Sequence, residues 1–175
     1  MQEEYFKIKD MDNTFDFTGK LSIINPDIYK AGDGFFMKIN DQKKVSEETA
    51  NDYKYDLSEW EWSRSEFLID SYFDGITYEQ SLRLAFDIVE LWGYKLHAQF
   101  PDEEFHIIIS VSTIDDTDEK IVMLRYYTYR GEESFHYKLD SLDRYQNSAI
   151  MVNVVEADEE YYDDDDEEDD DDIDI

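Results

Sequence analysis

Histidine and carboxylate side chains are the residues of this chain with the greatest capacity for chemistry. The three histidines are His97, His106 and His136, and the last two fall in strand-like segments that could place them side by side in one sheet. Two imidazoles beside a carboxylate can hold a metal ion. Asp and Glu make up 46 of the 175 residues, however, so a carboxylate near either histidine is expected by chance. We therefore predict no metal and no cofactor.

No other pattern matches a catalytic or ligand-binding motif. The segment beginning at Asp10 has the spaced acids of a calcium loop, but Phe15 stands where that loop needs glycine and Leu21 where it needs glutamate. Gly32-Asp33-Gly34 lacks the Gly-Lys-Ser/Thr ending of a phosphate loop, and no serine lies in a Gly-x-Ser-x-Gly context. Cysteine is absent, which excludes thiolate nucleophiles and disulfides. The sequence predicts that the protein is not an enzyme.

Acidic residues dominate the charge along the whole chain. The net charge is −30, and fifteen of the acids lie between Glu156 and Ile175, where Lys, Arg and His do not occur. Residues 1–155 hold the other 31 acids and all 16 bases, so this body has the same net charge as the tail, −15. Such a body is unsuited to neutralising DNA phosphates, which requires Lys and Arg. It favours a basic partner reached by electrostatic steering.

The candidate contacts for such a partner are exposed acids and the end of the tail. A segment with so much charge and so little apolar surface does not fold alone. We therefore predict a globular domain over residues 1–155 and a disordered acidic tail over residues 156–175. The expected contacts are Asp102, Glu103, Glu104, Asp115, Asp116, Asp118, Asp163, Asp164, Asp165, Asp166, Glu167, Glu168, Asp169, Asp170, Asp171, Asp172 and the apolar tip residues Ile173 and Ile175.

The tail also motivates an alternative function. An acidic run with an apolar end resembles the tails of bacterial and phage single-stranded-DNA-binding proteins, which dock on partner proteins. The bacterial tails end in Pro-Phe, whereas this chain ends in Ile-Asp-Ile. Arg125, Tyr127 and Tyr129 would share one face of a strand, and such an aromatic and cationic face suits single-stranded nucleic acid. We favour a solvent-facing sheet surface with cross-strand pairs for these three residues.

The first seventy-odd residues suggest short strands, turns and loops. Alternation predicts strands at residues 5–9, 21–24 and 35–39, with turns at residues 25–27 and 32–34. Residues 40–56 form a polar loop with room for one helical turn after Ser46. Residues 57–70 fit strand and helix almost equally, and their aromatic and β-branched content favours strand.

The clearest predicted element is a helix from Thr77 to Gly93. Thr77 and Gln80 have the spacing of a capping box, and Gly93 has the residue type that ends helices. The apolar residues that follow fall on one face, which is typical of a helix that packs on a core: Tyr78, Leu82, Ala85, Phe86 and Val89.

The remaining segments predict an antiparallel sheet. Residues 105–112 and 120–130 form a hairpin around the turn at residues 115–118, residues 134–137 suggest a short strand, and residues 149–155 form a last strand. The expected fold is α+β, a single domain with an antiparallel sheet packed against the main helix. A small β-barrel with an inserted helix is the alternative.

These observations predict a non-enzymatic acidic inhibitor that neutralises a basic partner such as a nuclease or another nucleic-acid-binding protein. Immunity proteins, antitoxins and DNA mimics are of this type. The N-terminus lacks the features of a signal peptide, and no apolar stretch approaches the roughly 20 residues that span a bilayer. We expect a cytoplasmic protein with no membrane partner, for which direct nucleic-acid binding is disfavoured.

Overall fold

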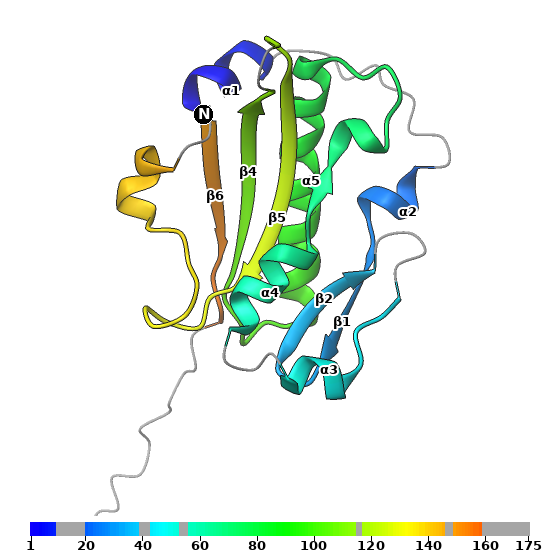
Figure 1. Ribbon diagram of the computed structural model, residues 1–175, viewed down its shortest axis with the longest axis vertical. Coiled ribbons are helices and arrows are strands. Elements are labelled where there is room, and N and C mark those ends of the chain that lie inside the picture. The colour runs from blue at the N-terminus through cyan, green and yellow to red at the C-terminus, as the bar shows by residue number, and fades with distance from the viewer. Residues whose placement is uncertain (10–19, 39–42, 53–55, 115–116, 146–148, 159–175) are drawn as a thin grey trace, which may run out of the picture.

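The computed structural model describes residues 1–9, 20–38, 43–52, 56–114, 117–145 and 149–158. These residues form one compact α+β body (Figure 1), which confirms the predicted fold class. In chain order the elements are α1 (Gln2–Ile8), α2 (Leu21–Ile24), β1 (Asp27–Ala31), β2 (Gly34–Lys38), α3 (Glu47–Asp52), α4 (Leu57–Arg64), β3 (Phe67–Leu68), η1 (Ile69–Ser71), α5 (Tyr78–Gln99), β4 (Phe105–Thr113), β5 (Lys120–Thr128), η2 (Leu139–Arg144) and β6 (Ala149–Val155).

An open four-stranded antiparallel sheet organises the body. Its strand order is β3-β5-β4-β6, while β1 and β2 form a separate two-stranded sheet. The β4–β5 hairpin is the predicted one, with Ile109 opposite Leu124, and β6 adds to the other side of β4 with Met151 opposite Ile109. The sheet is open between β3 and β6, so the β-barrel alternative is wrong.

Helix α5 packs against one face of this sheet and builds the main core. Every second side chain of β4 points toward the face that α5 covers. These side chains are all fully buried: Phe105, Ile107, Ile109 and Val111. Trp92 contributes the largest buried side chain of the helix, and its Nε1 donates to the Ile24 carbonyl at 2.9 Å. No helix in the described segments is both long and apolar enough to cross a bilayer.

The capping box predicted for α5 is present, but the predicted end of the helix is wrong. The Gln80 amide donates to Thr77 Oγ1 at 3.3 Å, and the Thr77 amide donates to Gln80 Oε1 at 3.0 Å. The helix then continues past Gly93 to Gln99. Gly93 faces β6, where an added Cβ would lie 3.4 Å from Val155 Cγ2. The glycine therefore allows close packing of helix on sheet instead of ending the helix.

Three segments predicted as strands are helices. Residues 5–8 belong to α1, which packs on α5 through the buried Ile8, and residues 21–24 form α2. Most of the predicted strand over residues 57–70 is α4, whose first turn is capped by the Asp56 side chain accepting from the Glu59 amide at 3.3 Å. Only Phe67–Leu68 of that segment is a strand, β3. Long-range packing overrides weak local alternation in each case.

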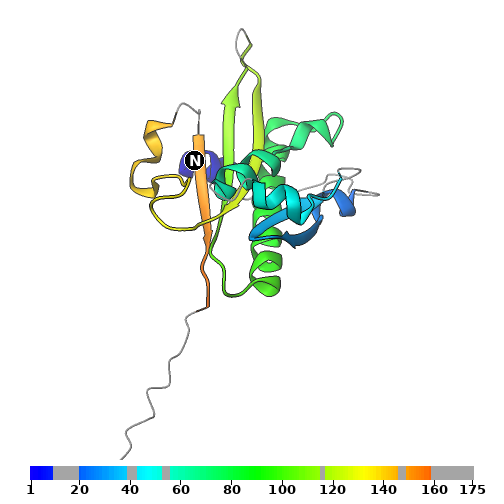
Figure 2. The same cartoon turned by 60° about the horizontal axis from the view of Figure 1, so that its bottom comes forward.

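Two units flank the main sheet on opposite sides, as Figures 1 and 2 show. One is the β1–β2 hairpin, which confirms the predicted turn at residues 32–34, together with α3, which forms the helical turn after Ser46. The other is the segment of residues 131–145 beside β6, where the strand predicted at residues 134–137 is absent. Residues 10–19, which hold most of the calcium-like sequence, lie outside the described residues.

A buried ion pair links α4 to both sheets. Glu61 has 1% of its surface exposed, and its carboxylate accepts from the backbone amides of Phe35 and Thr128, each at 2.8 Å. Arg130 completes the site with a two-pronged contact, donating from Nη2 to Glu61 Oε1 at 2.6 Å and from Nη1 to Oε2 at 3.0 Å. Four donors therefore satisfy this carboxylate, as a buried charge requires.

Candidate functional site

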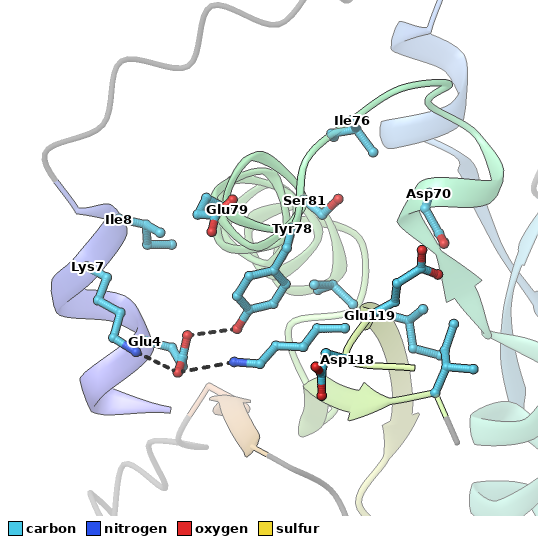
Figure 3. Close-up of a pocket in the computed structure, with 14 residues that line it drawn as sticks. Glu4, Lys7, Ile8, Asp70, Ile76, Tyr78, Glu79, Ser81, Asp118 and Glu119 are labelled. Carbon is cyan, nitrogen blue, oxygen red and sulfur yellow. Dashed lines mark hydrogen bonds and ion pairs between the residues drawn. The ribbon is translucent and has the colours of Figure 1, made fainter. Parts of the chain in front are cut away.

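An acidic cavity of about 640 Å³ lies between α1, the first turn of α5, η1 and the start of β5 (Figure 3). Five carboxylates and two lysines line it, which gives a net charge of −3. The acids come from four separate parts of the chain, so only the fold brings them together. The charged residues are Glu4, Lys7, Asp70, Glu79, Asp118, Glu119 and Lys120.

Glu4 is the centre of the polar contacts in this cavity. It accepts a hydrogen bond from Lys7 at 3.0 Å and from the Tyr78 hydroxyl at 2.9 Å, and its carboxylate lies 3.6 Å from Lys120 Nζ (Figure 3). The hydrogen bonds from Lys7 and Tyr78 lower the pKa of Glu4, while burial and the bond to Glu4 raise the pKa of Tyr78. Glu4 therefore stays ionised and Tyr78 stays protonated near neutral pH, and their hydrogen bond joins α1 to the start of α5.

The other four carboxylates of the cavity remain available to a ligand. Asp70, Glu79, Asp118 and Glu119 are exposed and form no ion pair with any described residue. The wall between them includes aliphatic side chains, among them Ile76 and Ile121. Unpaired carboxylates around an aliphatic wall suit a lysine or arginine side chain, whose stem is apolar and whose head is cationic.

The fold separates the predicted acidic contacts into two groups. Asp118 lines the acidic cavity, whereas Asp102, Glu103 and Glu104 precede β4 at its other end. β4 has nine residues, so about 30 Å separates the two groups. Asp115, Asp116, the acids of residues 163–172, Ile173 and Ile175 lie outside the described residues.

Sequence reasoning missed four acids of the cavity. Glu119 is adjacent to the predicted Asp118 and could have been included on that ground. Glu4, Asp70 and Glu79 carry no local signal, because they reach the cavity through α1, η1 and α5.

A second polar cluster surrounds His106. Its Nε2 lies 2.7 Å from Glu104 Oε1, and its Nδ1 lies 2.7 Å from the Tyr127 hydroxyl, which in turn accepts from the Tyr137 amide at 2.9 Å. Burial lowers the pKa of His106, which favours the neutral imidazole. A neutral ring that donates to Glu104 and accepts from Tyr127 satisfies every member of this chain, so its evident role is to anchor the segment of residues 131–145.

His106 and His136 are close, though not within one sheet as predicted. Tyr129 stacks on His106 with ring centroids 5.1 Å apart and contacts His136 edge-on at 5.8 Å. His136 lies outside the strands, in the segment of residues 131–145. Within the described ranges, no group of three or more His, Asp or Glu side chains has a geometry that could hold a metal ion.

The face formed by Arg125, Tyr127 and Tyr129 is not an open surface. Tyr127 is fully buried against Phe135, and the Arg125 guanidinium lies 3.8 Å from the centre of the Trp62 ring. Helix α4 and the segment of residues 131–145 thus cover this part of the sheet. Neither the predicted solvent-facing surface nor a stacking platform for single-stranded nucleic acid is present at Tyr127.

Comparison with known proteins places the chain in a family. No curated protein and no solved structure matches it. A family model matches residues 3–162, which include every helix and strand except the first residue of α1 and stop before the acidic run that begins at Asp163. The chain therefore belongs to the family described as the uncharacterized protein PM0498 family.

Proposed function

We propose that this protein is a non-enzymatic binding protein that neutralises a basic protein partner, of the nuclease or nucleic-acid-binding kind. Immunity proteins, antitoxins and DNA mimics act in this way, by placing carboxylates where the partner would bind phosphates. The observation that carries the proposal is the acidic cavity, in which four carboxylates lack an ion-pair partner among the described residues.

The placement of the carboxylates and aliphatic side chains in the cavity supports a protein ligand over a metal ion. Metal ions require several oxygen or nitrogen ligands converging on one point, and no such group occurs among the described side chains. A lysine or arginine from a partner would instead pass its stem along Ile76 and Ile121 and place its charge among Asp70, Asp118 and Glu119.

The charge of the whole chain supports the same conclusion. At −30, the protein attracts basic surfaces over the Debye length of about 8 Å at physiological salt. Attraction of this kind increases association rates and is weakened by added salt. The family match covers the folded body and not the run of acids that begins at Asp163. We therefore assign specific recognition to the body and faster encounter to the tail.

Affinity capture from a native lysate at low salt, followed by calorimetry of the purified pair, tests this function. Asp118→Asn combined with Glu119→Gln should weaken binding about tenfold, because two partly desolvated ion pairs contribute roughly 0.7 kcal/mol each. Asp140→Asn combined with Asp143→Asn removes the same charge from exposed positions on η2 and should change binding little. Capture of only neutral or acidic proteins, or equal losses in both variants, would refute the proposal.

A further inference from the structure

A second concave surface lies farther along α5 than the acidic cavity. It is a groove of about 530 Å³ between the C-terminal half of α5 and the edge strand β6. Gly93 and Val155 both line it, on its helix and strand sides. Phe86, Val89 and Met151 contribute apolar surface to it, and Tyr94 stands at its side with 71% of its surface exposed.

The charged residues of this groove are almost all acidic. Glu90 and Glu156 are exposed and make no ion pair with any described residue. The one residue of the lining that can become cationic is His97, and its Nε2 already lies 3.5 Å from Asp158. A ligand that fits must therefore combine an apolar group for the floor with positive charge for the rim.

The charge pattern decides among the possible occupants. A second copy of the chain would bring another net charge of −30 against an acidic rim. The chain's own residues 159–175 hold thirteen acids and would be repelled by Glu90 and Glu156 in the same way. A basic segment of another protein meets no such repulsion.

Helix α5 also connects the groove to the proposed binding site. Helix α5 lines both, with Tyr78 and Glu79 in the acidic cavity and Glu90 and Tyr94 in the groove. The rise of an α-helix places Glu79 and Tyr94 about 22 Å apart. Tyr5 of α1 packs on Phe86 with ring centroids 5.2 Å apart, so α1 adjoins the groove as well as the cavity.

We infer that this groove, between α5 and β6, docks a segment of the basic partner in which an apolar side chain is flanked by lysine or arginine. The apolar side chain occupies the groove beside Tyr94, and the basic residues pair with Glu90 and Glu156. The inference rests on the proposed function. It adds a second contact, through which the protein would select its partner by amino-acid sequence as well as by charge.

The full chain can be titrated with three synthetic peptides, of alternating lysine and leucine, of lysine alone, and of alternating glutamate and leucine. The amide NMR signals of Gly93 and Tyr94 report on the groove. We expect the lysine–leucine peptide to shift these signals and to bind more tightly than oligolysine, and the glutamate–leucine peptide to leave them unchanged. A lysine–leucine peptide that leaves both signals unchanged, or that binds no better than either other peptide, would overturn the inference.

Two variants make the test specific. Tyr94→Ala should weaken binding of the lysine–leucine peptide about tenfold, as expected for loss of an aromatic anchor. Leu21→Ala removes a similarly exposed apolar side chain, 65% exposed on α2, and should leave binding unchanged. Equal affinities of these two variants would overturn the inference. Failure to capture any basic protein rejects the proposed function, whereas a captured basic partner that leaves the Gly93 and Tyr94 signals unchanged rejects the groove alone.

Discussion

Replacing Arg130 by alanine should destabilise the protein strongly, because it leaves the buried Glu61 carboxylate without its counter-ion. The two backbone amide donors of Glu61 remain, and the two guanidinium donors are lost. Hydrogen bonds to a charged group contribute about 1.5–3 kcal/mol each, which gives roughly 3–6 kcal/mol. The side chain of Arg130 is 24% exposed, so water can enter the vacated space and the lower end applies. We expect a loss of about 3 kcal/mol.

Urea unfolding followed by tryptophan fluorescence measures this loss, since Trp92 is fully buried in the native core. A loss of about 3 kcal/mol corresponds to a decrease in Tm of roughly 6–12 °C for a body of this size. Arg144→Ala removes an exposed guanidinium on η2 and should change the free energy of unfolding by less than about 0.5 kcal/mol. If Arg130→Ala costs less than about 1 kcal/mol, or no more than Arg144→Ala, the buried pair does not stabilise the fold as we infer.

Three further predictions follow from packing and charge. Gly93→Ala should raise Tm, because alanine stabilises a helix by about 1 kcal/mol relative to glycine and its Cβ would lie at an ordinary contact distance of 3.4 Å from Val155. Gly93→Leu should instead lower Tm, because the larger side chain would displace β6. The lowered pKa of Glu4 means that its ionised form stabilises the fold above the usual carboxyl pKa of 4.5, and that this stability is lost as pH falls through the folded-state pKa. Glu4→Gln should therefore reduce Tm at neutral pH and match the wild type in strong acid; equal differences at both pH values would contradict the role of Glu4. Deleting residues 159–175 removes thirteen acids and should slow association with a basic partner without changing Tm, which stopped-flow fluorescence and calorimetry can check.

Local patterns predicted the parts of the fold that depend on neighbouring residues. The capping box of Thr77 and Gln80 and the apolar face of α5 are encoded within one segment, as is the β4–β5 hairpin. The helices α1 and α4 depend on contacts outside their own sequence. Ile8 is buried in the main core, to which distant elements contribute, and Trp60 packs on Phe36 of β2 with ring centroids 5.0 Å apart. Their short sequences alternate weakly and therefore indicated strands.

The candidate site was less predictable than the fold, for the same physical reason. In a chain with 46 acids, an acidic residue type carries little information about position. What distinguishes Glu4, Asp70 and Asp118 is their convergence from α1, η1 and the turn before β5. The Glu61–Arg130 pair likewise joins residues 69 positions apart. Composition could indicate the sign of the partner's charge, but only tertiary structure locates where that charge would bind.

The acids that border the strands have a consequence for the unfolded chain as well. β4 contains three consecutive isoleucines and β6 carries no charge, and segments of this kind are prone to aggregate when they are exposed. Asp102, Glu103 and Glu104 precede β4, while Glu156 and Asp158 follow β6. Charges in these places act as gatekeepers, since they keep newly made chains from joining through their exposed strands. Neutralising them should lower the yield of refolding while the native protein keeps its stability.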